Sequence, residues 1–291
     1  MSDRPFARKL IKLAARLAGP ATAHRQDLWP GLAIDRTTGV VRWRGRALLT
    51  LTPFGDIVPQ NADMLAIVGS GPSLSRQRPE LLPDGTAILL NGAATLAERV
   101  APLAVAVEDE RFVFRHFAMI AALPPNIPLF LSPAAMRAIA ERDAVVLRDR
   151  PIALIENLAK PLGGRKRALS DASLDPYLLR GPDDAALSIA PDHGVVIAGT
   201  VALSALQICV NADPRQIIIA GVDLSNANAA PRFYEDTSDR APSGIVTGLD
   251  RIMAVFALGK ARAASQKIEL ICASPTSALR DIGIPYKAVL D

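Results

Sequence analysis

The chain has 291 residues, half of them hydrophobic, and a formal net charge of +4. This length and composition suit one large or two small domains with a substantial core. No apolar run reaches the roughly 18 residues that a membrane-spanning helix needs, and the N-terminus lacks the long apolar block of a secretory signal. Because Cys209 and Cys272 lie inside apolar runs, we expect core thiols of a cytoplasmic protein and neither a disulfide nor a metal site.

The basic excess of the chain is confined to its N-terminus. Residues 1–46 hold ten Lys and Arg against three Asp, whereas the remainder is slightly acidic. Helical spacing gathers the apolar residues of residues 1–18 on one face and leaves basic residues over much of the rest. The apolar face consists of Phe6, Leu10, Leu13 and Leu17, and the basic residues are Arg8, Lys9, Lys12 and Arg16.

Two interpretations of this N-terminal helix stay open. A basic amphipathic helix binds an anionic membrane surface, which would make the protein peripheral on the inner membrane. Alternatively, the helix packs on the domain and its basic face is solvated. Nucleic acid is not expected as a partner, because the region has neither a recognisable binding motif nor stacking aromatics.

The segment that follows predicts a small β appendage. Residues 32–34 and 40–43 flank a polar turn and are typical of a hairpin, and residues 47–51 are a candidate third strand. We therefore interpret residues 1–60 as an appendage made of the basic helix and the hairpin.

From residue 61 to the C-terminus the pattern changes to alternating strands and helices. This alternation predicts an α/β fold, a doubly wound parallel sheet of the Rossmann-like kind. Polar segments near 157–193 and 224–248 are expected to be loops or lids. The expected strands are 65–68, 87–90, 103–107, 128–131, 144–147, 216–220 and 268–272, and the expected helices are 112–122, 133–142, 199–210 and 249–266.

A glycine turn ends the first of these strands. In the sequence GSGPSL, the residues Gly69, Ser70, Gly71 and Ser73 expose backbone N–H groups and a hydroxyl where a helix begins, which suits a phosphate. A purely structural tight turn is the alternative. A dinucleotide fingerprint needs a third glycine and an acidic residue about 20 positions on, whereas the next strand here ends on Asn91. Asn91 suits a ribose or a base, and NAD or FAD is disfavoured.

An acidic triplet, Glu108-Asp109-Glu110, follows another strand. Ligands of open α/β sheets bind beyond the carboxyl ends of the strands, so Asp109 is a candidate to face a sugar or act as a base. The alternative is an acidic cluster that the dipole of the next helix favours.

The second half of the chain supplies the remaining candidates. Gly199 and Thr200 open a helix and are expected to contact a nucleotide, and Asp223 ends a strand where a polar contact is expected. In the loop that follows, Arg232 and Tyr234 would stabilise a leaving phosphate, and Asp236 would serve as a base. His193 is a further catalytic candidate. For each loop residue, an ordinary surface position is the alternative.

These motifs together resemble the family 42 bacterial sialyltransferases and, more broadly, the motility-associated glycosyltransferases. LAIVGSGPSL is similar to their opening strand and turn, GTVALSALQICVNADPRQIIIAGVDLS to their Ser-Gly helix and following strand, and IELICASPTSAL to their final strand. The resemblance spans roughly residues 64–280. It implies the sialyltransferase variant of the GT-A fold. It also implies a transferase without metal or other cofactor that uses a CMP-activated sugar, such as sialic acid or Kdo, and inverts the configuration at its anomeric carbon.

The sequence also departs from that family. The turn asparagine of the family is Ser70 here, and residues 224–250 lack the catalytic histidine of the family's loop. The resemblance predicts a glycosyltransferase that acts on a glycan or glycolipid such as lipopolysaccharide core, with homo-oligomers possible. The missing histidine keeps a non-catalytic nucleotide- or glycan-binding protein open as the alternative, and a nucleotide-dependent oxidoreductase ranks third.

Overall fold

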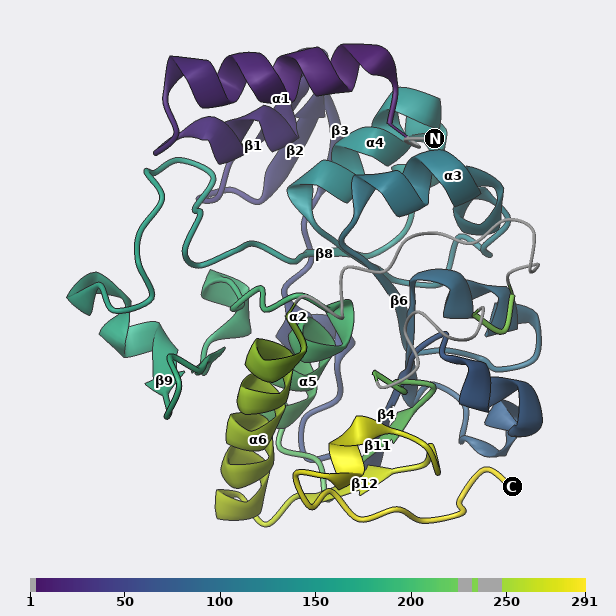
Figure 1. Cartoon of the computed structure of the whole chain (residues 1–291). Coiled ribbons are helices and arrows are strands. Elements are labelled where there is room, and N and C mark those ends of the chain that lie inside the picture. Colours follow the sequence, from purple (N-terminus) through teal and green to yellow (C-terminus); the bar gives the residue numbers. More distant parts are fainter. Residues whose placement is uncertain (1–3, 225–231, 235–247) are drawn as a thin grey trace.

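A computed structural model describes residues 4–224, 232–234 and 248–291. The chain is an α/β protein built on a seven-stranded parallel sheet with helices on both faces (Figure 1). The order of the strands in this sheet is β12-β11-β4-β5-β6-β7-β8. The strands are β4 (Met64–Val68), β5 (Ala87–Leu90), β6 (Ala104–Val107), β7 (Leu129–Leu131), β8 (Ile152–Leu154), β11 (Gln216–Ala220) and β12 (Glu269–Cys272).

Both faces of the sheet are buried, which explains why its strands are continuous apolar runs. In β4, Leu65 and Ile67 pack toward one core, together with α5 and α6, and Ala66 and Val68 pack toward the other, together with α3 and α4. This confirms the predicted doubly wound, Rossmann-like arrangement. The helices are α3 (Glu110–Ala121), α4 (Pro133–Asp143), α5 (Val201–Asn211) and α6 (Leu249–Ser265), with shorter 3-10 turns η2 (Pro72–Arg76), η3 (Pro79–Leu81), η4 (Asn91–Glu98) and η9 (Ala278–Arg280).

The chain reverses direction across the sheet at one place. It enters at β4, adds β5 to β8 outward on one side, and then returns to lay β11 against the other side of β4. The carboxyl ends of β4 and β11 therefore form the topological switch point, where open α/β sheets bind their ligands.

The N-terminal appendage forms as predicted and shares the main core. It contains α1 (Phe6–Ala18), η1 (Ala23–Leu28), the antiparallel strands β1 (Leu32–Ile34), β2 (Val40–Trp43) and β3 (Arg46–Thr50), and the short α2 (Phe54–Ile57). Leu32 and Val41 are buried with residues of the large sheet, and Phe54 meets Phe130 edge-on at 5.0 Å. The appendage is therefore packed onto the Rossmann-like unit.

Two segments differ from the expected structure. Residues 144–147 form a 3-10 turn, η5 (Ala144–Leu147), because the Asp143 side chain accepts from the Val145 N–H and closes the backbone. The strand of this region is β8 instead. Residues 157–193 are not a polar lid throughout, since Leu174 and Leu178 are buried in a small core of their own. The elements there are η6 (Ala172–Tyr177), β9 (Leu178–Arg180), β10 (Ala186–Ser188) and η7 (Pro191–His193).

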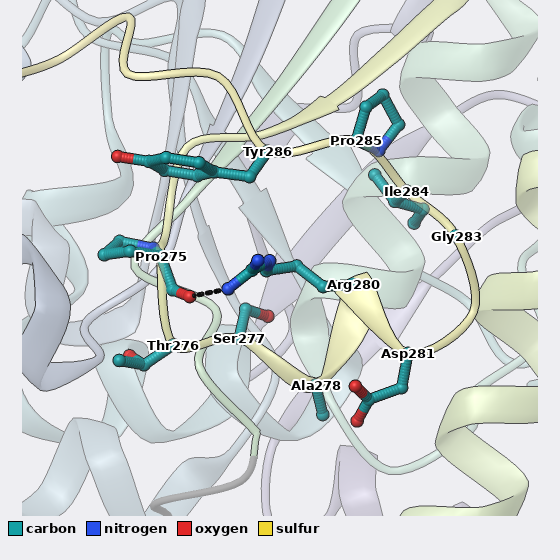
Figure 2. Close-up of a pocket in the computed structure, with 10 residues that line it drawn as sticks. All are labelled: Pro275, Thr276, Ser277, Ala278, Arg280, Asp281, Gly283, Ile284, Pro285 and Tyr286. Atoms are coloured by element: carbon teal, nitrogen blue, oxygen red, sulfur yellow. Dashed lines mark hydrogen bonds between the residues drawn. The ribbon is translucent and has the colours of Figure 1, made fainter.

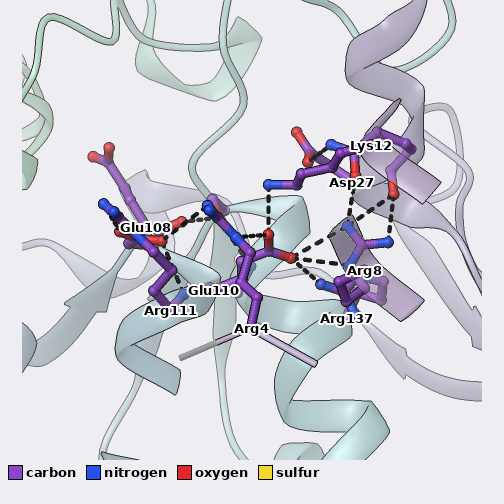
Figure 3. Close-up of polar contacts among 12 residues, drawn as sticks. Arg4, Arg8, Lys12, Asp27, Glu108, Glu110, Arg111 and Arg137 are labelled. Carbon is purple, nitrogen blue, oxygen red and sulfur yellow. Dashed lines mark hydrogen bonds and ion pairs between the residues drawn. The ribbon is translucent and has the colours of Figure 1, made fainter. Parts of the chain in front are cut away.

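Helix α1 lies with its basic side against the protein. Figure 3 shows the carboxylate of Glu110, at the start of α3, surrounded by cationic side chains. Arg8 is 1% exposed and donates to Glu110 Oε2 at 3.2 Å, and Lys12 Nζ lies 2.5 Å from Oε1. Arg4 and the fully buried Arg137 also contact this carboxylate. The expected alternative, a packed helix with a solvated basic face, is wrong for Arg8.

The position of Arg8 is fixed by further hydrogen bonds. Its guanidinium donates to the Trp29 carbonyl at 2.5 Å and to Gln26 Oε1 at 2.6 Å. Burial alone would raise the pKa of Glu110, but the surrounding cations, Lys12 and Arg8 foremost, outweigh it and lower the pKa to about 2. The cluster is thus fully ionised at neutral pH and joins α1 to the first turn of α3.

Removing the charge of Glu110 should destabilise the fold. We predict that Glu110→Gln lowers the free energy of unfolding by about 3 kcal/mol at pH 7, because Arg8 and Arg137 stay buried without their shared counter-charge. Since the folded pKa lies below the ordinary value of 4.5, the contribution is present above that pH and is lost as the pH falls toward 2. Urea denaturation from pH 7 to pH 3 measures it. The half-exposed pair of Glu80 and Arg99 provides the control, and Glu80→Gln should change stability by less than about 0.5 kcal/mol.

Candidate functional site

The glycine turn after β4 touches the turn after β11 through the backbone. Gly69 N–H donates to the Ala220 carbonyl at 2.8 Å, and Gly71 N–H donates to the Gly221 carbonyl at 2.7 Å. A Cβ on Gly69 would overlap the Gly221 carbonyl, and one on Gly71 would lie 2.5 Å from the Asp223 carboxylate. The two glycines of the turn are therefore required by the close approach of two chain segments at the switch point.

Asp223 and Ser73 brace this turn. The Asp223 carboxylate accepts from Ser73 N–H at 2.8 Å and from Ser73 Oγ at 2.6 Å, and it is 4% exposed. Ser274, beyond the end of β12, joins the network through Ser73 Oγ at 2.9 Å and Gly221 N–H at 2.9 Å. Ser73 and Asp223, both predicted to contact the ligand, are thus engaged with each other.

The turn consequently offers a phosphate fewer free hydrogen-bond donors than the sequence predicts. The N–H groups of Gly69, Gly71 and Ser73 are used within the protein. In the described part of the chain, the Ser70 N–H and hydroxyl make no hydrogen bond, and only the Ser70 carbonyl is engaged, by Phe233 N–H at 3.3 Å. Ser70 is therefore the residue of the turn that is equipped to bind a phosphate.

Two buried oxygens without hydrogen-bond partners lie beside the turn. They are Asn91 Oδ1, after β5, and Glu108 Oε1, after β6. Strand register pairs Val68 with Leu89 and Leu90 with Ala106, which brings the ends of β4, β5 and β6 level with one another. Within the described residues neither oxygen is satisfied, although buried polar atoms are almost always paired. Ser204 Oγ, which neighbours Glu108, is a further buried atom without a partner, so part of this unmet hydrogen-bonding capacity lies between the Glu108 and Ser204 side chains.

Asn91 also has an unusual backbone. Its φ of 48° lies in the left-handed region, which asparagine tolerates better than most residues. This conformation turns the chain from β5 into η4 (Asn91–Glu98). Asn91 directly follows β5, as the sequence predicts, and its role in a nucleotide site stays a prediction.

Glu108 titrates near neutral pH. Burial raises the pKa of its carboxyl to about 7, the neighbouring Ser204 hydroxyl opposes that shift, and the charge of Asp109 adds to it. The Ser204 side chain comes from α5 and is itself fully buried. Sequence reasoning missed Glu108 because it singled out the next residue of the triplet.

Asp109 has a different role. Its carboxylate accepts from Arg111 N–H at 2.9 Å and from Arg111 Nε at 2.7 Å, and so caps the start of α3. Its side chain is 36% exposed. The alternative that the sequence left open for Asp109, an acidic residue at a helix start, therefore describes its contacts.

An aromatic group covers the same edge of the sheet. The Tyr234 ring lies against Gly92, where a Cβ would overlap it. His116 meets this ring edge-on at 5.6 Å and lies 5.1 Å from Phe112. The backbone of His116 departs from helical geometry inside α3, with φ −122° and ψ 32°. Tyr234 thus lies against the residue that follows Asn91, and His116, expected only to pack on a helix, contacts it.

The first turn of α6 brings a guanidinium to the start of α5. Thr200 Oγ1 accepts from the Ala202 N–H at 3.3 Å and caps the helix one turn before Ser204. Gly199, with φ +103°, packs on α6, and Arg251 Nη2 lies 3.4 Å from the position of a Cβ there. Arg251 forms no ion pair with any described residue, so its positive charge is available to a ligand. No motif in the sequence singled it out.

His193, Asp236 and Arg232 were also predicted at the site, and the structure places only His193 elsewhere. His193 is exposed and stacks on Tyr177 at 4.7 Å, in the segment that carries η6 and η7. Its neighbour Asp192 caps the Phe54 N–H instead of facing the turn. Asp236 lies outside the described residues. Arg232 is described and precedes Phe233, whose N–H reaches the glycine turn.

A pocket of about 710 Å³ opens next to Ser274 (Figure 2). Its wall is the C-terminal segment from Pro275 to Tyr286. Arg280 donates to the Pro275 carbonyl at 2.5 Å, and its guanidinium lies 5.7 Å from the centre of the Tyr286 ring. Among the described residues, no group of three or more His, Cys, Asp and Glu could hold a metal ion, and no helix is long and apolar enough to cross a membrane.

The titration of Glu108 should make the free energy of unfolding depend on pH. Because the folded state holds the proton more tightly than the unfolded chain, ionised Glu108 costs folding free energy above pH 7 and nothing below pH 4.5. We predict that Glu108→Gln raises the free energy of unfolding at pH 8 by up to about 3 kcal/mol and leaves it unchanged at pH 4.5. Denaturation at both pH values tests this, with the exposed Glu98→Gln as control. An equal effect at both pH values would contradict the assignment.

Comparisons with known proteins leave the site to be interpreted from its own geometry. No protein-family model matches the chain, and neither a curated protein nor a solved structure is similar to it. The Rossmann-like sheet and the residues at its switch point are therefore the basis of any functional proposal.

Proposed function

We propose that the protein is an inverting glycosyltransferase that takes its sugar, a sialic acid, Kdo or a related ulosonic acid, from a CMP-activated donor. The observation that carries the proposal is the buried, unsatisfied oxygen of Asn91 at the end of β5, the strand next to the glycine turn. A nucleoside monophosphate has complementary groups, since its hydroxyl and amino groups donate to Asn91 while its phosphate accepts from Ser70. The short motifs that resemble family 42 sialyltransferases favour CMP.

Charge complementarity supports an anionic donor. Arg251 and Tyr234 lie around the carboxyl edge of the sheet and supply donors for the phosphate that leaves with CMP. Gly199 and Thr200 bring the start of α5 to the same edge. An ulosonic acid adds a carboxylate to this phosphate, so the donor is negatively charged on both its phosphate and its sugar.

Glu108 is the base that we propose for the transfer. A carboxyl with a pKa of about 7 is half ionised at neutral pH, which is the range in which a general base works best. In the proposed step Glu108 takes the proton of the acceptor hydroxyl while the acceptor oxygen bonds to the anomeric carbon of the donor sugar. The bond from that carbon to the phosphate oxygen breaks at the same time, and CMP leaves. His116 beside Tyr234 then faces the leaving group.

The acceptor is proposed to be a cell-surface glycan such as lipopolysaccharide core, assembled on the cytoplasmic side of the inner membrane. The pocket beside Ser274, lined by Tyr286 and Arg280, lies at the β12 edge of the sheet, four strands from β6. It therefore suits a distal sugar of an extended acceptor and not the unit whose hydroxyl meets Glu108. A non-catalytic nucleotide-binding protein is the second candidate. It is favoured by the absence of a histidine from residues 224–250.

Calorimetry with CMP tests the nucleotide site. We expect CMP to bind and NAD not to bind, and Asn91→Ala to weaken CMP about tenfold, because a buried hydrogen bond is lost. Asn61→Ala is the matched control, since Asn61 also has a left-handed backbone, with φ 55°, but is exposed and precedes the start of β4, at the opposite end of that strand from the glycine turn. If CMP does not bind, or if both variants weaken it equally, the donor assignment is wrong.

Turnover separates an enzyme from a binding protein. We predict that CMP release from CMP-sialic acid or CMP-Kdo falls at least about 100-fold in Glu108→Gln, because the general base is removed, while CMP affinity stays the same. Asp109→Asn should retain most of the activity, since Asp109 caps a helix. Loss of turnover in Asp109→Asn alone would move the base to Asp109. Binding of CMP with no turnover of either donor would favour the second candidate.

A further inference from the structure

The outer side of α1 is an apolar ridge. Phe6 is 73% exposed, Leu10 52%, Leu13 55% and Leu17 80%. These are four of the nine large hydrophobic residues that are exposed in the described part of the chain, and they lie on one helix face. Figure 1 shows α1 at the edge of the molecule, with no element of the protein beyond it. Contiguous exposed apolar patches of this kind mark interaction surfaces.

The helix is held so that this ridge cannot turn inward. Its opposite side carries Arg8 and Lys12, which contact the buried carboxylate of Glu110. Rolling α1 to bury the ridge would strip Glu110 of both of these cations and would break the hydrogen bonds of the buried Arg8 guanidinium to Gln26 and Trp29, which is strongly unfavourable. The exposure of the ridge is therefore a fixed property of the fold.

Positive charge borders the ridge. Between Phe6 and Ala18 the helix has no acidic residue, and Lys9 and Arg16 are exposed. Helical spacing places Lys9 and Arg16 together along one flank of the ridge. Neither forms an ion pair with any described residue, so both charges are available to an external anionic surface.

We propose that α1 lies in the interface of an anionic membrane, with Phe6, Leu10, Leu13 and Leu17 below the headgroups and Lys9 and Arg16 at the level of the lipid phosphates. An apolar face combined with basic residues is the pattern that binds such surfaces. A second copy of the chain fits less well. A symmetric pair of these helices would bring the two basic flanks toward one another.

Vesicle binding of the full chain tests this proposal. We expect sedimentation with vesicles that contain 30% phosphatidylglycerol, and weaker binding to pure phosphatidylcholine. Leu10→Ser with Leu13→Ser should reduce the partition coefficient at least about tenfold, because the inserted area is lost. Lys9→Gln with Arg16→Gln should reduce binding to the anionic vesicles only, and added salt should weaken the wild type.

The control is another exposed leucine. Leu81, 46% exposed in η3, lies outside the helix, so Leu81→Ser should bind like the wild type. All these positions are exposed, and unchanged thermal unfolding would show that the variants are folded. Absence of binding to anionic vesicles would overturn the proposal, as would equal binding of the Leu10 and Leu13 double variant. A dimer in analytical ultracentrifugation that this double variant abolishes, without vesicle binding, would assign the ridge to a second copy instead.

Discussion

The contact between the turns of Gly69 and Gly221 is the constraint on which the rest of the site depends. Two parallel strands can end side by side with their backbones this close only where side chains are absent. The contact consumes the donors of Gly69 and Gly71, and Asp223 takes that of Ser73. What is left for a ligand is Ser70, together with the neighbouring strand ends. The site is therefore defined more by the ends of β5 and β6 than by the glycine turn.

The fold places the three adjacent acidic residues Glu108, Asp109 and Glu110 in different environments. Glu108 ends the strand and points toward α5, where burial keeps it close to neutral. Asp109 turns back to cap α3, and Glu110 is buried among cations on the far side. One carboxyl is thus half protonated near pH 7 while another, two residues away, remains ionised to about pH 2. Environment and not residue type sets these differences.

The sequence predicts the large sheet well, because a strand buried on both faces must be apolar throughout. Strands 65–68, 87–90 and 216–220 are found within one residue of their expected bounds. It fails at residues 144–147, where an apolar run ends in a turn that the Asp143 side chain closes. Such a local hydrogen bond competes with strand formation and leaves the hydrophobic pattern unchanged.

The site was predictable in outline only. Strand ends at the switch point could be named from topology, so Asn91 and the glycine turn were found. The choice between Glu108 and Asp109 depends on which side chain faces α5, and that contact joins residues 96 positions apart, at Glu108 and Ser204. No sequence pattern points to His116, because it contacts Tyr234 through a local departure of α3 from helical geometry.

The orientation of α1 also depends on a long-range contact that the sequence pattern does not reveal. Periodicity identifies an apolar and a basic face but not which of them the protein covers, because that is decided by one buried carboxylate about 100 residues away. Glu110 is that carboxylate, and it lies two residues after Glu108. A membrane bound to the ridge of α1 would therefore be held at a fixed distance and orientation from the proposed base. A transferase that acts on lipid-linked glycans needs such a fixed relation, because its acceptor hydroxyl stands at a set height above the membrane surface.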